Sequence, residues 1–287
     1  MVRMQKTALT ERLHDQCAYE TGLAARLRAA SRQDRLSLYG TLENDYTRHF
    51  PEHHPEDSSA AERIAGYETA FLRRFLKPDT VLAEIGPGRG RLAFALAPHV
   101  AGVYGVDVTE IYLPSEGRPS NFEFRLSDGI NMPFPPNTLD VVISNQLMEH
   151  LHPDDAADQL REIQRVLKQG GAYVCVTPSP INGPHDSSAY FDDLMCPIKN
   201  RNYVATGLHL KEYTSRELTA LFRSVDFRRV QSWIGARGHY IPLPGTLLSW
   251  IESIVQLIPA PMRKRSSLLA PVLGNRVVAT KKVMVIG

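Results

Sequence analysis

The stretch that decides the fold is Val81-Leu82-Ala83-Glu84-Ile85-Gly86-Pro87-Gly88-Arg89-Gly90. It begins as a short apolar run, ends that run on an acid, and continues into closely spaced glycines before a helical pattern starts. This order is typical of a buried strand that turns into a helix, because glycine lets the backbone turn tightly and approach a ligand without an obstructing Cβ. An isolated loop of this kind also fits an ordinary turn that binds nothing, so the rest of the chain has to decide.

Downstream of this loop, short apolar runs alternate with helical patterns, which is typical of a parallel sheet with helical crossovers. The expected strands are 81–85, 101–107, 122–126, 139–144, 172–177, one near 228–234 and a last one over 277–285. The predicted fold class is therefore α/β, with a seven-stranded, mostly parallel sheet and helices on both faces.

The residues before the sheet have a helical period instead. Capping boxes at Ser31-x-x-Asp34 and Ser59-x-x-Glu62 predict the starts of two of three helices. We expect residues 1–78 to form an N-terminal helical cap on a sheet domain over 79–287. Within that domain, 178–212 and 239–275 are less regular and are expected to be insertions.

Composition excludes several classes of protein. Lys plus Arg is 33 and Asp plus Glu is 31, so the net charge of +2 provides little of the positive field that nucleic-acid binding uses. The three cysteines are odd in number and widely spaced, so we expect neither a disulfide framework nor a thiolate zinc site, and no metal. The start lacks the apolar segment of an export signal and no long apolar run occurs, so a cytoplasmic location is expected.

The glycine spacing also discriminates between cofactors. A dinucleotide fingerprint, G-x-G-x-x-G, requires glycine at 91, where this chain has Arg91, so NAD or FAD binding is disfavoured. The carboxylate of Glu84 at the strand end instead suits a ligand that carries an ammonium group. An acid also ends the second expected strand, at Asp107, and its carboxylate can accept two hydrogen bonds from a vicinal diol.

Over residues 80–235 the chain resembles the class I S-adenosylmethionine-dependent methyltransferases, particularly the small-molecule group that includes ubiquinone and menaquinone biosynthesis enzymes. The resemblance rests on the segments 84–90, 105–107, 127–134, 137–145 and 162–171, which follow in the family's order. It implies a Rossmann-like fold and S-adenosyl-L-methionine as cofactor. The cofactor-binding residues that it implies are Glu84, Gly86, Gly88 and Gly90 for the methionine part, Asp107 for the ribose, Asp128 and Gly129 for the adenine, and Asn145 after the fourth strand.

Methyl transfer to oxygen gains from a general base, and histidine suits that role near neutral pH. The candidate catalytic residues are His150, His185 and His209, which follow expected strands at the edge where open α/β sheets bind ligands. Each is also compatible with a structural role, and His152, beside a helix start, is expected to be structural. Tyr39, Tyr46 and His49 fall at helical spacings and predict either an aromatic cover for the cofactor or core packing.

A wide apolar face over 246–258, followed by Arg263-Lys264-Arg265, predicts a docked lid or a homodimer contact, with a peripheral membrane contact as the alternative. The fourth strand is followed by Gln146-Leu147 and lacks the Pro-Pro-aromatic device of base-flipping enzymes, so no nucleic acid is expected. The hypothesis is a methyltransferase of a small metabolite or a glycan- or lipid-linked acceptor, with O-methylation preferred and 178–212 and 239–275 lining the acceptor pocket. The alternatives are a non-catalytic cofactor-binding or interaction protein and, ranked lower, an RNA or protein methyltransferase.

Overall fold

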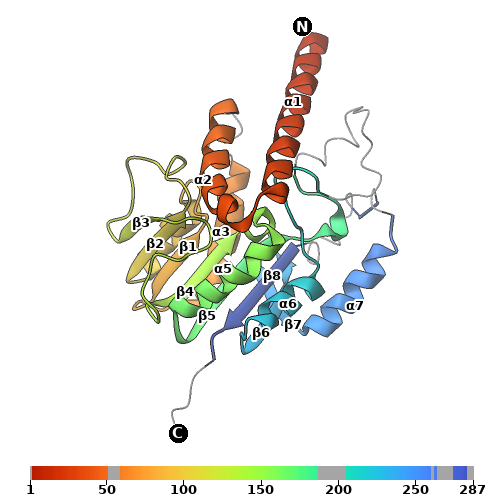
Figure 1. The fold of residues 1–287 in the computed structure, drawn as a ribbon. Helices are drawn as coiled ribbons and strands as arrows, with labels where there is room; N and C mark the ends of the chain where they lie inside the picture. The colour runs from red at the N-terminus through yellow and green to blue at the C-terminus, as the bar shows by residue number, and fades with distance from the viewer. Residues whose placement is uncertain (1, 51–58, 187–204, 260–261, 264–273, 283–287) are drawn as a thin grey trace.

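The computed structural model describes residues 2–50, 59–186, 205–259, 262–263 and 274–282. These residues form one eight-stranded sheet in the order β3-β2-β1-β4-β5-β8-β6-β7 (Figure 1). The strands are β1 (Val81–Ile85), β2 (Gly102–Asp107), β3 (Phe122–Leu126), β4 (Leu139–Asn145), β5 (Leu167–Pro178), β6 (Arg229–Ala236), β7 (His239–Leu243) and β8 (Gly274–Thr280). Strands β1 to β5 are parallel, whereas β8 runs antiparallel between β5 and β6, and β6 and β7 form a hairpin.

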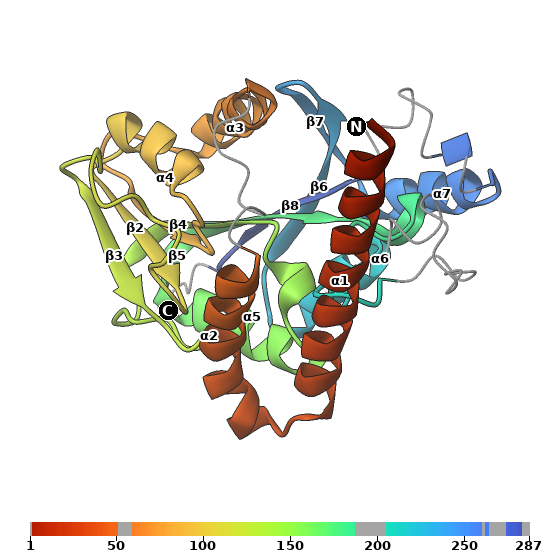
Figure 2. The same cartoon turned by 90° about the horizontal axis from the view of Figure 1, so that it is seen from above.

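Helices cover both faces of the sheet, and two more lie across one of its edges (Figure 2). They are α1 (Val2–Ala29), α2 (Arg32–His49), α3 (Ser59–Leu72), α4 (Arg91–Leu96), α5 (Pro153–Val166), α6 (Ser215–Ser224) and α7 (Gly245–Gln256). Short 3-10 turns cover Arg73–Phe75, Ala97–His99, Met148–His150 and Pro180–Asn182. Helices α3 and α4 share one buried core cluster with the sheet, and α5 and α6 share the other. The predicted α/β Rossmann-like architecture with helices on both faces is confirmed.

The sheet has eight strands, so the prediction of seven was wrong. The additional strand is β7, which the sequence analysis assigned to a less regular segment. A tight turn at Arg237 and Gly238, both with positive φ, folds the chain back onto β6 and pairs Ala236 with His239. The five-residue run is short and contains Pro242, which is tolerated because β7 lies at the edge of the sheet.

Most of the local signals were correct. Strands β1 and β3 have the predicted bounds, and Ser31 caps α2 by accepting a hydrogen bond from the Asp34 amide. The predicted start of β5 at residue 172 was wrong: α5 ends at Val166 and β5 begins at Leu167, so Gly170 and Gly171 lie inside the strand. The proposed division at residue 78 stays a prediction, and Phe71 of α3 already belongs to the sheet core.

The outer helix α7 places its polar and apolar side chains in an unusual way. Glu252 is buried and accepts a hydrogen bond from the Ser215 amide, whereas Trp250, Ile254 and Leu257 are 72%, 62% and 83% exposed. Within the described residues, none of the helices is both long enough and apolar enough to cross a bilayer. The homodimer and membrane contacts expected for this segment stay predictions.

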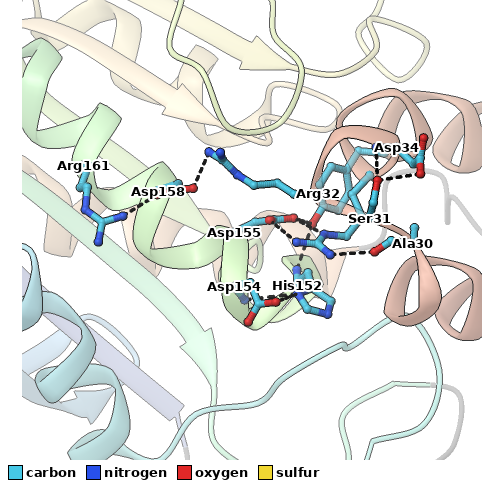
Figure 3. Close-up of polar contacts among 11 residues, drawn as sticks. Ala30, Ser31, Arg32, Asp34, His152, Asp154, Asp155, Asp158 and Arg161 are labelled. Atoms are coloured by element: carbon cyan, nitrogen blue, oxygen red, sulfur yellow. Dashed lines mark hydrogen bonds and ion pairs between the residues drawn. The ribbon is translucent and has the colours of Figure 1, made fainter.

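The hairpin of α1 and α2 is fixed to α5 by charge (Figure 3). Arg35 donates to both carboxylate oxygens of Asp155, from Nε at 2.6 Å and Nη2 at 2.5 Å, and the two residues are only 4% and 0% exposed. Tyr39 donates a further hydrogen bond to the same carboxylate at 2.8 Å. On the outer side, Arg32 pairs with Asp158. Burial would raise the pKa of Asp155, but the bonds from Arg35 and Tyr39 outweigh it and hold that pKa below its usual value.

The buried ion pair predicts a large and asymmetric effect of substitution. Arg35→Ala should lower the free energy of unfolding by about 3–5 kcal/mol, because it leaves the Asp155 carboxylate buried without its cation. Removing both charges, in Arg35→Met with Asp155→Leu, should recover most of that loss. Urea denaturation measures both.

The matched control is Arg32→Ala, which breaks the exposed pair with Asp158 on the same helix pair. It should cost less than about 1 kcal/mol. Equal losses in Arg35→Ala and Arg32→Ala would contradict the assignment of the buried pair as the anchor of the hairpin.

Candidate active site

A cavity of about 440 Å³ lies at the carboxyl edge of the parallel strands, under the α1–α2 hairpin. Parallel strands collect the residues that follow them at one edge, which is where open α/β sheets bind ligands. Its wall combines loops after β1, β2, β3 and β4 with both helices of the hairpin and the segments around 185 and 209. Among the residues that line the cavity are Gln16, Glu20, Tyr39, Glu43, Tyr46, Gly86, Gly88, Asp107, Tyr112, Gly129, His150, His185 and His209.

A second cavity, of about 370 Å³, adjoins the other side of the glycine loop. Glu84 and Asn145 line it, and Gly86 and Gly88 line both cavities. The glycine loop therefore lines both cavities. The described residues of 239–275 do not line the larger cavity, whereas His185 and His209 of the segment 178–212 do.

The loop requires glycine for two separate reasons. Gly90 has φ +75° and caps α4, and a Cβ at this residue would lie 2.7 Å from the Phe94 ring. Gly88 has φ +50°, and a Cβ there would meet no heavy atom within 4 Å. Gly90 thus permits close packing, and Gly88 leaves open space beside the backbone for a ligand.

Glu84 ends up buried with an unsatisfied oxygen. The residue is 3% exposed, its Oε2 has no hydrogen-bond partner among the described residues, and the backbone amide of Ala93 donates to the carboxyl group. Burial raises the pKa of Glu84 to about 8. A ligand with an ammonium group would supply both the charge and the donors that this carboxylate lacks.

Asp107 ends β2 and its side chain borders the larger cavity. Burial raises its pKa to about 7, although the backbone amides of Val108, Thr109 and Gly88 donate to the carboxylate and oppose that rise. The Val108 amide lies 2.7 Å from Oδ1. Asp107 lines the cavity, and a carboxylate has acceptor capacity for the proposed bonds to a vicinal diol.

The carboxylate of Asp128 makes its hydrogen bonds within its own loop. Its Oδ1 accepts from the amides of Ile130 and Asn131, at 2.9 and 2.7 Å, and Oδ2 accepts from the Asn131 side chain. The carboxylate therefore closes its own loop, and the cavity is lined by Ser127 and Gly129 on either side of it. The role of Asp128 toward adenine stays a prediction.

The candidate histidines do converge. His185 and His209 both donate from Nδ1 to the carboxylate of Glu212, at 3.2 and 2.7 Å, and the amide of His185 adds a third bond at 2.8 Å. Burial would raise the pKa of Glu212, but these bonds outweigh it and lower that pKa to about 2. Burial would lower the pKa of His209, but the hydrogen bond to Glu212 outweighs this effect and the pKa is raised. Glu212 therefore remains a carboxylate that orients both rings.

His150 joins the same wall. Its Nδ1 donates to the Leu208 carbonyl at 3.1 Å, and its ring packs edge-on against His209 with centroids 4.9 Å apart. His152 is the N-cap of α5 and accepts from the Asp154 amide, as its predicted structural role requires. Of the predicted aromatic cover, Tyr39 and Tyr46 line the cavity.

Sequence reasoning missed several polar residues of this cavity. Gln16 and Glu20 lie one helical turn apart on α1, and Tyr46 donates to Glu20 at 2.9 Å. Glu43 of α2 accepts from Tyr112 at 2.6 Å. A signal existed for the α1 pair, because two polar residues at i and i+4 interrupt the apolar side of a helix. The pairing of α2 with the loop after β2 had no local signal.

Comparison with known proteins finds a methyltransferase domain in part of the chain. Residues 83–175 match the family model described as a methyltransferase domain. An uncharacterized methyltransferase of Bacillus subtilis is 26% identical over 59% of this chain and 63% of its own length. A demethylmenaquinone methyltransferase of Corynebacterium kroppenstedtii is 32% identical over 42% of this chain and 51% of its own length. The matched segment thus spans less than two thirds of either relative.

A solved structure agrees in fold. The S-adenosylmethionine-dependent methyltransferase of Archaeoglobus fulgidus superposes with a TM-score of 0.51 at 20% identity, covering 83% of this chain and 100% of that one. The sheet, with an antiparallel β8 beside β5, and the family match together support a class I S-adenosylmethionine-dependent methyltransferase. The part of the chain that matches the methyltransferase family model is residues 83–175.

S-adenosyl-L-methionine is the cofactor of this class, and the residues present fit it. The unsatisfied oxygen of Glu84 suits the amino group, the open space at Gly88 leaves room beside the loop, and Asp107 offers a carboxylate toward the ribose. Tyr39 and Gly129 come together on the side where the adenine would lie, with 3.2 Å between a Cβ built on Gly129 and the Tyr39 ring.

Cofactor binding can be measured by thermal shift. S-adenosyl-L-methionine at 100 times its dissociation constant should stabilise the fold by about 2.7 kcal/mol, whereas NAD should give no shift. Asp107→Ala should abolish the shift, and Glu123→Ala, an exposed acid on neighbouring β3, should leave it unchanged. A larger shift with NAD than with S-adenosyl-L-methionine would refute the assignment.

The raised pKa of Glu84 predicts how stability changes with pH. Because the folded state holds this proton up to about pH 8 and the unfolded chain releases it near pH 4.5, stability falls as pH rises between those values. Glu84→Gln removes this penalty. Its stability relative to the parent should therefore increase between pH 5 and pH 8, by on the order of 3 kcal/mol.

Denaturation of both proteins without ligand at several pH values makes this comparison. Asp107 titrates in both proteins, so the difference isolates Glu84. Parallel stability curves would show that the Glu84 pKa is not raised.

Proposed function

We propose that this chain methylates a hydroxyl group of a small polar acceptor. The observation that supports the proposal is one cavity bordered on one side by the cofactor loops, through Gly86 and Asp107, and on the other by His185 and His209, which Glu212 orients. A general base that a buried carboxylate holds in position, next to a methyl donor, suits proton removal from a hydroxyl.

The wall contributed by the hairpin supports a polar acceptor. Glu20 and Glu43 border the cavity, and the Oε1 atom of Gln16 is buried without a hydrogen-bond partner among the described residues. A buried acceptor atom of this kind favours a substrate that donates a hydrogen bond and discriminates against one that cannot. The proposed acceptor is therefore a small molecule with several hydroxyl or amino donors.

His185 is the proposed base. Its Nδ1–H is held by Glu212, so Nε2 carries the lone pair, and its side chain is 31% exposed, whereas that of His209 is 10% exposed. When bound, S-adenosyl-L-methionine supplies a methyl group already activated on a sulfonium. His185 takes the acceptor's hydroxyl proton while that oxygen forms its bond to the methyl carbon and the carbon–sulfur bond breaks. The walls of the cavity position the acceptor and limit access of water.

The test is a mass-spectrometric screen of small polyhydroxylated and amino acceptors with labelled S-adenosyl-L-methionine. We expect O-methylated product, and His185→Gln should lower kcat by roughly 10²- to 10⁴-fold with little change in cofactor affinity. His99→Gln, on the far side of α4, is the matched control and should behave like the parent. Product methylated only on nitrogen or carbon would refute O-methylation, and cofactor binding without any turnover would favour a non-catalytic protein.

A further inference from the structure

Three potential metal ligands converge beside the acceptor cavity. They come from two separate parts of the chain, namely Glu149 and His150 in the 3-10 turn after β4, and His209 before α6. One ligand atom from each lies within 4.8 Å of the others. The sequence analysis expected no metal, because only cysteine spacing was considered there, and His209 lies 59 positions after His150 along the chain.

Both histidine rings are already oriented as metal-binding rings usually are. The carbonyl of Leu208 and the carboxylate of Glu212 can only accept, so Nδ1 carries the proton in His150 and in His209. This leaves Nε2 of each ring with a lone pair. Donation of the second ring nitrogen to a carbonyl or carboxylate is the arrangement that fixes the tautomer of metal-ligating histidines.

The third member supplies an independent observation. Glu149 is 0% exposed, and its Oε2 accepts from the Thr177 hydroxyl at 2.8 Å. Its Oε1 is buried and has no hydrogen-bond partner among the described residues. A buried carboxylate oxygen without a donor is costly, and a bound cation is one of the few groups that satisfies both its charge and its lone pairs.

We propose that Glu149, His150 and His209 bind one divalent first-row transition-metal ion at the acceptor wall. Two imidazoles and one carboxylate suit Zn²⁺, Mn²⁺, Fe²⁺ or Co²⁺ and do not suit Mg²⁺ or Ca²⁺, which prefer oxygen ligands throughout. Bonds of about 2.0–2.2 Å place tetrahedral ligands about 3.4 Å apart, so binding draws the three side chains together from their present separation. Three protein ligands also leave a position open for another molecule.

That open position gives the ion a role that rests on the proposed function. His150 and His209 line the same cavity as His185, so the acceptor's hydroxyl oxygen occupies the remaining position on the ion. The cation makes that hydroxyl more acidic, and its proton passes to Nε2 of His185. The oxygen then bonds to the methyl carbon as the carbon–sulfur bond breaks, with no change of oxidation state at the metal. The acceptor class is therefore a small hydroxylated molecule whose reacting oxygen can ligate a metal.

The experiment measures metal binding before any activity. The full chain is freed of metal with a chelator and titrated with Co²⁺, followed by its visible absorption, and with Zn²⁺ by calorimetry, without cofactor or acceptor. We expect one ion per chain. Glu149→Gln keeps the size of the side chain and an acceptor for Thr177, and it should weaken binding at least tenfold, as should His150→Ala.

Far-UV circular dichroism and melting temperature show whether each variant is folded, and His99→Gln is the control that keeps the parent's affinity. Absence of stoichiometric binding to the parent overturns the proposal, as does unchanged binding in folded Glu149→Gln and His150→Ala. Binding without methylation of any hydroxyl supports the metal site and counts against the proposed function. Hydroxyl methylation by a chain that binds no metal does the reverse.

Discussion

One buried ion pair joins the α1–α2 hairpin, which covers the cavity, to the helices of the sheet domain. The pair of Arg35 and Asp155 holds the α1–α2 hairpin to α5, and neither charge is stable at that depth without the other. Because the guanidinium bonds both carboxylate oxygens, it fixes orientation as well as distance. Tyr39 extends this contact to the cavity, since its hydroxyl bonds Asp155 and its ring lies beside Gly129. The position of the hairpin thus sets the distance between the acceptor wall and the strand ends.

The strand-end acids show how binding conflicts with stability. Glu84 and Asp107 both have pKa values raised by burial, so the ligand-free protein keeps two carboxyl groups where ionisation is unfavourable. The partner expected for them is a ligand, in contrast to Asp155, whose partner is part of the chain. Glu212 differs from both. Hydrogen bonds from the rings of His185 and His209 and from the His185 amide lower its pKa to about 2. The pKa values of these acids therefore differ according to whether the chain itself supplies enough hydrogen-bond donors to offset burial.

Local signals in the sequence predicted the parts of the fold that depend on local physics. Apolar runs located β1 and β3, and capping chemistry located the start of α2. Glu84, Asp107 and the candidate histidines were found because strand ends meet at one edge. The sequence did not reveal β7, whose pairing depends on a positive-φ turn, nor the loop-closing bonds of Asp128. Glu149 and Glu212 were missed because each has a partner far away in the sequence, Thr177 for Glu149 and His185 for Glu212.

The two walls of the cavity have separate origins in the chain. The wall that is expected to bind the cofactor comes from the loops after β1 to β3. Much of the opposite wall, including Gln16, Glu20 and Glu43, comes from α1 and α2, which precede the sheet in the sequence. Few side chains tie the hairpin to α5, and others join α2 to the loop after β2. A different hairpin before position 50 that keeps these contacts would replace one wall of the cavity. Under the proposed function, such an exchange would change the acceptor and leave the glycine loop and the end of β2 intact.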